Sequence, residues 1–233
     1  MILAEGLFGE PNSKTAMGVI KYGHDPVVAV LDSTRAGRNA AEWLGPEHAA
    51  PVMATLGEAL AHEPTALLIG TAPQGGRIPP AWRATIIDAI VHGLDVISGL
   101  HEFVSEDPEF SSLAATHGVE LIDHRRPPER HEVASGRKHR PGSHVILTVG
   151  TDSAIGKRTT ATILTQALND RGIRAVLVGT GQTGLIQGAR YGVALDAIPC
   201  QYGSGEMEAT VVDAFEGEDP DVIVIEGQGA LSH

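Results

Sequence analysis

The stretch that decides the fold of the second half of the chain is GTDSAIGKRT, residues 150–159. An apolar run at residues 145–149 precedes it, and a helical pattern begins near its end. A strand, a glycine-bounded loop with a lysine and then a helix form a phosphate-binding loop, where backbone N–H groups hold an anion. We therefore predict a cofactor-binding loop made of Gly150, Thr151, Asp152, Ser153, Ala154, Ile155, Gly156, Lys157, Arg158 and Thr159.

This loop departs from the usual phosphate-loop pattern in two ways. Five residues separate Gly150 from Gly156, and Arg158 stands where a Ser or Thr hydroxyl normally binds Mg²⁺. Thr159 carries the next hydroxyl, but helix geometry turns it by about 100° from position 158. The sequence thus predicts an anion site with a second basic contact from Arg158, and a metal ion only if the ligand is Mg-ATP.

Length, charge and cysteine content exclude several classes of protein. The chain has 233 residues, enough for one large domain or two modest ones, and a net charge of −12, which argues against a general nucleic-acid binder. Its single cysteine excludes an internal disulfide and indicates a reducing compartment. We find neither a signal peptide nor an apolar run near the ~20 residues of a membrane span, and expect a cytoplasmic protein without a membrane partner.

The first 123 residues alternate short apolar runs with helical patterns. Alternating strands and helices with aliphatic strands predict a parallel sheet covered on both faces, so the fold class is α/β and this domain, residues 1–123, is Rossmann-like. Strands are expected at residues 1–4, 27–31, 66–69, 95–97 and 119–122. Helices are expected at residues 14–22, 37–44, 56–62, 81–92 and 108–117, with Gly23, Gly93 and Gly118 left-handed at helix ends.

Residues 124–143 form a basic segment that is rich in proline and glycine, and they are predicted to link two domains. The segment holds six of the seventeen lysines and arginines. One interpretation is a solvated linker, and the other is that Arg125, Arg126 and Arg130 face a phosphate bound by the second domain.

Residues 144–233 are predicted to form a P-loop NTPase-like domain. Three strands are expected at residues 145–149, 175–178 and 222–225, with helices at residues 157–170 and 206–215. The glycine-rich stretch 179–205 is expected to be a loop that faces a ligand, and Cys200 to be buried. Three strands are few for this fold, so we expect a chain shortened at its C-terminus or an edge covered by a neighbouring subunit of a homo-oligomer.

Two carboxylates of this domain are candidate catalytic groups. Glu226 ends the aliphatic run VIVI within VIVIEGQG, residues 222–229, which places it at the carboxyl edge of a parallel sheet, where ligands bind. It is a candidate general base, or with Thr159 a Mg²⁺ ligand. Glu208 near a helix start is the second candidate. Another strand precedes GQTG, residues 181–184, so Gly181, Gln182 and Thr183 are expected to contact the cofactor.

The first domain carries polar residues after several of its expected strands. Each would lie at the carboxyl edge of the sheet, where together they predict a second anionic or polar site. The sequence EGLFG, residues 5–9, follows the first expected strand but lacks the glycine spacing of a dinucleotide-binding fingerprint. The substrate-binding candidates are Lys14, Arg35, Gln74, Arg77 and His101.

Taken together, these motifs resemble a bacterial and archaeal family long catalogued as a domain of unknown function. The resemblance rests on residues 3–9, 14–15, 32–34, 72–76, 98–102, 150–160, 181–184 and 226–229. It covers essentially the whole chain and implies a Rossmann-like domain followed by a P-loop domain that normally continues further. Some members look like D-glutamate or other D-amino-acid N-acetyltransferases that use acetyl-CoA and operate with an N-acetyl-amino-acid racemase.

The sequence is compatible with three functions. In the first, Lys157 and Arg158 hold the phosphates of acetyl-CoA, Glu226 or Glu208 deprotonates an amino-acid substrate, and backbone N–H groups at residues 181–184 stabilise the oxyanion. The second is ligation or phosphoryl transfer with Mg-ATP, as in the dethiobiotin synthetases that the loop also resembles. The third is a non-catalytic nucleotide or CoA sensor.

Overall fold

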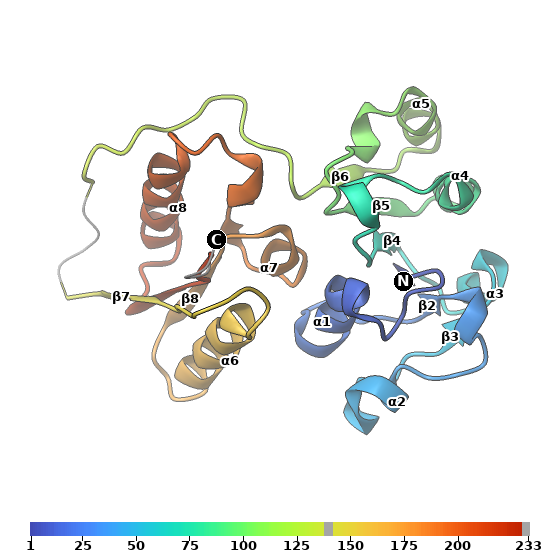
Figure 1. The fold of residues 1–233 in the computed structure, drawn as a ribbon, viewed down its shortest axis with the longest axis horizontal. Coiled ribbons are helices and arrows are strands. Elements are labelled where there is room, and N and C mark those ends of the chain that lie inside the picture. The colour runs from blue at the N-terminus through green and yellow to red at the C-terminus, as the bar shows by residue number, and fades with distance from the viewer. Residues whose placement is uncertain (138–141, 230–233) are drawn as a thin grey trace. The chain divides into compact units, whose positions relative to one another are not determined.

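The computed structural model of the chain describes residues 1–137 and 142–229. It contains two compact units, Met1–Arg125 and Arg126–His233, which are treated separately below (Figure 1). The division lies near the start of the basic segment: residues 124 and 125 belong to the first unit, and the described residues from 126 onward belong to the second.

The first unit is built on a six-stranded parallel sheet with the strand order β3-β2-β1-β4-β5-β6. The chain starts in the middle of this sheet, moves to one edge, and then returns to build the other side. This reversal between β1 and β4 is the switch point at which open α/β sheets bind ligands. The strands are β1 Ile2–Leu3, β2 Val30–Leu31, β3 Val52–Met53, β4 Ala66–Ile69, β5 Asp95–Ser98 and β6 Leu121–Asp123.

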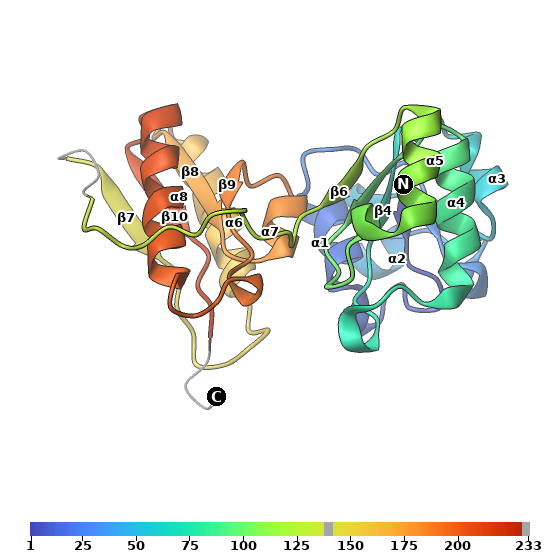
Figure 2. The same cartoon turned by 90° about the horizontal axis from the view of Figure 1, so that it is seen from above.

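Helices cover the sheet of the first unit, and the largest core lies under three of them. Its fully buried members include Leu67 and Val96 on the strands, Ile86 on α4 and Phe110 on α5. Figure 2 shows α4 and α5 side by side. The helices are α1 Lys14–Tyr22, α2 Ala41–Leu44, α3 Leu56–Leu60, α4 Arg83–Val91 and α5 Pro108–His117.

Local signals explain where α5 begins and ends. Asp107 accepts hydrogen bonds from the N–H groups of Glu109 (3.0 Å) and Phe110 (3.1 Å), and Pro108 occupies the first turn. Gly118 ends the helix in the left-handed conformation, with a φ of 69°. These are the features from which the sequence predicts this helix.

The second unit has a four-stranded parallel sheet with the order β7-β10-β8-β9. Helix α6 packs on one face, over Val222 and Val224, and α8 packs on the other, over Val178 and Ile223. The strands are β7 His144–Leu147, β8 Ala175–Gly179, β9 Tyr191–Gly192 and β10 Val222–Ile225, and the helices are α6 Lys157–Asn169, α7 Gln182–Ile186 and α8 Gly203–Glu218 (Figure 1).

Short 3-10 turns complete both units. They are η1 Pro11–Ser13, η2 Ser33–Arg35, η3 Pro46–His48, η4 Gln74–Gly76, η5 Pro80–Trp82, η6 Val104–Glu106 and η7 Leu195–Ala197.

The α/β class with a Rossmann-like first domain and a P-loop-type second domain is confirmed, whereas several local predictions are wrong. The expected ligand-facing loop at residues 179–205 contains α7, β9 and η7. Strands β3 and β9 are only two residues long and escape periodicity. Gly23 has a φ of −70° and is extended, and Cys200 is exposed rather than buried.

The basic segment is not simply a solvated linker, because part of it lies along α8. The backbone N–H of Glu132 donates to Glu206 (3.0 Å), and His131 contacts the same carboxylate (3.1 Å) while stacking on Tyr202. A side chain at Gly205 would meet the backbone N of residue 134 at 2.8 Å, so glycine permits this close approach.

Candidate functional site

The predicted phosphate loop joins β7 to α6. Ala154 and Gly156 have positive φ angles of 57° and 101°, which bend the backbone into a loop before the helix begins at Lys157. A pocket of about 210 Å³ opens beside it. Thr148, Val149, Ile155, Gly156, Lys157 and Thr160 line this pocket. The loop therefore has the backbone geometry and a cavity in which an anion can bind.

Lys157 connects the loop to the segment that follows β10. Its Nζ atom donates to the carbonyl oxygens of Asp152 (2.6 Å) and Gly229 (2.9 Å). The ammonium group is thus held at the carboxyl edge of the sheet by two neutral acceptors, neither of which is a carboxylate. Arg158 and Thr159 follow in the first turn of α6 and are both partly exposed.

Glu226 lies at the same edge and is 8% exposed. Burial raises the pKa of this carboxyl, while hydrogen bonds from the N–H groups of Thr180 and Gly181 and the charges of Arg158 and Lys157 oppose the shift. The donated bond from Thr180 to Oε2 measures 3.2 Å. A carboxylate whose pKa is raised toward neutrality is a better base than an ordinary surface glutamate.

Hydrogen bonds tie the ends of the three strands together around Glu226. Thr148 Oγ1 accepts from the N–H of Gly227 (3.0 Å) and donates to the Ile225 carbonyl (3.1 Å), which joins β7 to β10. Thr180, after β8, donates from Oγ1 to the Glu226 carbonyl oxygen (2.8 Å). The phosphate loop and Glu226 are therefore brought together by the pairing of β10 with β7 and β8 rather than by sequence proximity.

The residues after β8 differ from the expected ligand-facing loop. Gly181 precedes α7, Gln182 is its first residue, and Thr183 is 7% exposed. The N–H groups of Thr180 and Gly181 act on the Glu226 carboxylate, and the N–H of Gly184 donates to the Gly181 carbonyl (3.1 Å). Of the N–H groups at residues 181–184, those of Gly181 and Gly184 therefore already have internal acceptors, and the oxyanion-stabilising role of this segment stays a prediction.

Glu208, the second predicted catalytic carboxylate, has a structural partner instead. Its oxygens accept hydrogen bonds from the N–H groups of Ser135 (2.9 Å) and Gly136 (2.7 Å), and Arg137 Nε donates at 3.3 Å. The backbone N–H of Ser135, followed by the other donors, lowers the pKa of Glu208 to about 2. A carboxylate this weakly basic is a poor general base at neutral pH.

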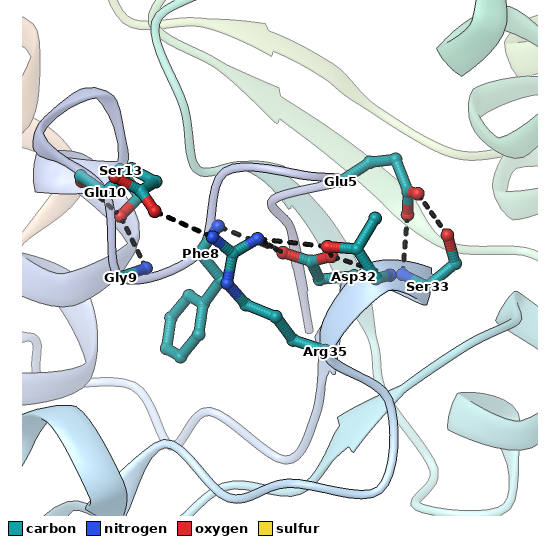
Figure 3. Close-up of polar contacts among 9 residues, drawn as sticks. Glu5, Phe8, Gly9, Glu10, Ser13, Asp32, Ser33 and Arg35 are labelled. Atoms are coloured by element: carbon teal, nitrogen blue, oxygen red, sulfur yellow. Dashed lines mark hydrogen bonds and ion pairs between the residues drawn. The ribbon is translucent and has the colours of Figure 1, made fainter.

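The carboxyl edge of the first unit carries a hydrogen-bonded cluster around Asp32 (Figure 3). Asp32 is fully buried and accepts hydrogen bonds from the Phe8 N–H (3.0 Å) and from Arg35 Nη1 (3.1 Å). Arg35 Nη2 donates to Glu10 at 2.9 Å. Glu5 accepts from both the N–H and the hydroxyl of Ser33. Burial acts to raise the pKa of Asp32, but the hydrogen bonds outweigh it and the pKa is lowered.

This cluster does not fit a dinucleotide, although the strand order is that of dinucleotide-binding domains. In those domains an acidic residue after the second strand accepts hydrogen bonds from a ribose. Asp32 follows β2 here, but it is fully buried and already accepts bonds from the loops on either side. Arg35, predicted to bind substrate, is likewise paired with two carboxylates, Asp32 and Glu10.

The other predicted substrate residues lie on separate loops of the first unit. Lys14 is the exposed first residue of α1, and Arg77 is exposed after η4. The Gly76 carbonyl accepts from the His101 N–H (3.1 Å), which ties this loop to the one after β5. Burial, then the nearby Arg125, lowers the pKa of His101, which favours the neutral form of its ring. The Gln74 side chain lies outside what the structure describes.

Arg125, predicted as one possible phosphate ligand, is 7% exposed, and its Nε donates to the Gly99 carbonyl at 2.9 Å. Its guanidinium is therefore engaged within the first unit.

Across residues 1–137 and 142–229, no group of three or more His, Cys, Asp or Glu side chains is placed to hold a metal ion. The same described residues include no helix that is both long and apolar enough to cross a membrane.

Comparisons with known proteins agree with the two-unit architecture. Residues 33–127 match a family model described as the Rossmann-like domain of DUF1611, a domain of unknown function, and residues 132–233 match its P-loop domain. A crystal structure of a DUF1611 family protein from Anabaena variabilis superposes with a TM-score of 0.88 at 35% identity, covering 100% of this chain and 67% of that one.

Two curated relatives carry a name that refers to an activity. A protein named D-glutamate N-acetyltransferase from Tritonibacter scottomollicae is 37% identical over 180 residues, which are 77% of this chain and 52% of the relative. A protein of the same name from Pseudoalteromonas sp is 37% identical over 167 residues, 71% of this chain and 48% of the relative. The chain thus spans about half the length of the curated relatives it matches. Domain matches and identity together establish that the chain belongs to the DUF1611 family.

Proposed function

We propose that the protein transfers an acetyl group from acetyl-CoA to the amine of a D-amino acid such as D-glutamate. The observation that supports the proposal is a buried carboxylate of raised pKa, Glu226, at the same sheet edge as Lys157 of the predicted phosphate loop. The names of the two relatives support the choice of acceptor and reaction.

The loop fits a carrier that has both phosphates and an apolar arm. Lys157, Arg158 and the first turn of α6 supply positive charge and N–H donors for phosphate oxygens. Val149 and Ile155, which are 78% and 54% exposed, line the adjoining pocket and offer an apolar surface. Bound acetyl-CoA would supply an activated thioester to this edge of the sheet. Arg158 in place of the Mg²⁺-binding hydroxyl favours holding phosphate over transferring it.

Glu226 is the base in the proposed reaction. Its carboxylate takes a proton from the substrate ammonium, which leaves a lone pair on the nitrogen. The nitrogen then forms a C–N bond to the acetyl carbonyl carbon and the C–S bond breaks. The second proton lost by the nitrogen passes to the leaving sulfur, which gives the amide and the free thiol. A raised pKa suits this role, because a proton is accepted more readily by a more basic carboxylate.

The test measures free thiol and ADP in parallel, with acetyl-CoA or ATP and a panel of D- and L-amino acids. We expect thiol release with a D-amino acid, insensitivity to a metal chelator, and no ADP. Release of ADP would instead indicate an ATP-dependent ligase or kinase. Cofactor binding without turnover on the whole panel would contradict acetyl transfer and favour a sensor.

A variant pair tests the loop itself. Lys157→Ala should weaken CoA binding about tenfold or more, since a hydrogen bond to a charged group contributes about 1.5–3 kcal/mol. Arg171→Ala is the matched control, because Arg171 follows α6 and donates to the Ala167 carbonyl at 2.8 Å. Equal CoA affinity of the two variants by calorimetry would refute the assignment of the loop.

A further inference from the structure

We propose that Gln228 positions the acceptor amine beside Glu226, so that the amine-binding subsite lies in the second unit. This inference rests on the proposed acetyl transfer and extends it to a residue that directly contacts the substrate. The ligand class is a primary amine on a small carboxylic acid.

The hydrogen-bond network fixes the orientation of the Gln228 amide. The Thr180 hydroxyl has one hydrogen, and it donates this hydrogen to the Glu226 carbonyl oxygen at 2.8 Å. Its contact with Gln228, also 2.8 Å, must therefore use the hydroxyl as acceptor and the amide NH₂ as donor. The amide oxygen is then directed away from Thr180, where it is an acceptor without charge.

Gln228 stands in the sequence between the proposed base and the residue that Lys157 contacts. Glu226 lies two residues before it, and the next residue, Gly229, accepts a hydrogen bond from Lys157 (2.9 Å). Gln228 is an exposed residue, whereas Glu226 and Thr180 are buried. A ligand entering this edge thus meets an exposed amide first and the buried carboxylate behind it.

Two acceptors of different character suit an amine that must lose a proton. An ammonium group has three N–H donors, of which the Glu226 carboxylate takes one and the Gln228 amide oxygen takes another. After proton transfer to Glu226, the amide oxygen still holds one N–H and leaves the lone pair directed elsewhere. This hydrogen bond restricts rotation of the amine about its bond to the α-carbon and adds no second negative charge to the site.

The test compares binding of D-glutamate with binding of glutarate, which has the same carbon chain and both carboxylates but no amine. Calorimetry is performed on the full chain in the presence of saturating CoA. We expect Gln228→Leu to weaken D-glutamate binding about tenfold and to leave glutarate binding unchanged. Gln201→Leu, at an exposed glutamine of the same unit, should change neither.

A second pair tests the role of Thr180 as the residue that orients the amide. Thr180→Val removes the hydroxyl and should reproduce the amine-specific loss, whereas Thr180→Ser keeps the hydroxyl and should restore discrimination between D-glutamate and glutarate. A fold defect would weaken both ligands and CoA together, so the ratio of the two affinities separates it from the proposed role.

The proposal is overturned if the wild-type chain binds D-glutamate and glutarate equally, or if Gln228→Leu retains the wild-type ratio. Amine-dependent binding through Gln228 without any thiol release would leave the subsite standing and refute the acetyl transfer. Thiol release with an unchanged affinity ratio in Gln228→Leu would do the reverse.

Discussion

The contact between Gly227 and Thr148 makes a quantitative prediction about the C-terminal unit. A methyl group added at Gly227 would lie 2.9 Å from the Thr148 carbonyl carbon and closer still to its oxygen. Ordinary carbon contacts begin near 3.4 Å, so Gly227→Ala must separate the ends of β7 and β10 by at least about 0.5 Å.

Two buried hydrogen bonds cannot follow that displacement. The N–H of Gly227 lies 3.0 Å from Thr148 Oγ1, and the N–H of Thr148 lies 3.1 Å from the Ile225 carbonyl. Both distances are already near the upper end of the normal range, about 3.2 Å, and both bonds should break. Because each buried unpaired donor costs about 1–3 kcal/mol and two are created, we expect Gly227→Ala to lower the free energy of unfolding by about 2–6 kcal/mol.

The two units can be followed separately during denaturation. Trp43 and Trp82 are the two tryptophans and both lie in the first unit, so their fluorescence reports that unit alone. Far-UV circular dichroism reports both units. Urea should unfold the second unit of Gly227→Ala earlier by circular dichroism, while the tryptophan transition stays at its wild-type midpoint.

Gly203→Ala is the matched control, because a side chain at Gly203 meets nothing within 4 Å and this residue begins α8. It should be neutral or slightly stabilising, since alanine favours a helix over glycine by about 1 kcal/mol. If Gly227→Ala unfolded within 0.5 kcal/mol of the control and bound CoA equally well, the close approach of β7 and β10 would be refuted.

Three further variants test electrostatics and buried polar groups. Glu226→Gln should raise the urea midpoint at pH 7, where the buried charge is unfavourable, and this gain over the wild type should disappear as the pH falls toward 4.5. Equal urea midpoints of the variant and the wild type at pH 7 would contradict the raised pKa. Glu208→Ala should speed trypsin cleavage after Arg137, because it removes the carboxylate that binds Ser135. In the wild type, an acid-active protease should cleave this segment faster as the pH falls from 4.5 toward 2, where Glu208 becomes protonated; unchanged cleavage would exclude the contact with Ser135. Thr71→Val should raise the free energy of unfolding by about 1 kcal/mol in the tryptophan transition, because the buried Thr71 hydroxyl has no hydrogen-bond partner among the described residues. A lower free energy of unfolding for Thr71→Val, with Thr71→Ser equal to the wild type, would show that the hydroxyl is paired.

Elements with a complete local pattern are predictable from the sequence. The bounds of α1, α5, β4 and β10 agree with the periodicity, and α5 also has its proline and aspartate at the start and glycine at the end. Strand β9 has two residues and gains its pairing from β8, a contact that no local pattern encodes. Helix α7 is only five residues long and includes a glycine, so propensity favours a loop there.

The side-chain partners were harder to predict than the elements that carry them. Glu208 is correctly placed near the start of a helix, but its donors come from residues 135–137, more than 70 positions earlier. The sequence likewise gives no sign that Arg35 is paired with Glu10, which is 25 positions away. Such partners depend on how the loops return to the sheet, and this is a tertiary property.

The two units also show why one local pattern can have opposite chemistry. Asp32 and Glu226 each follow an aliphatic strand at the carboxyl edge of a parallel sheet, and both are buried. Asp32 accepts from Phe8, Thr34 and Arg35, and these donors stabilise its charge and lower its pKa. Around Glu226, burial outweighs the donors and raises the pKa. Because a general base must accept a proton near neutral pH, this balance of donors and burial favours the second unit over the first as the place where the base acts.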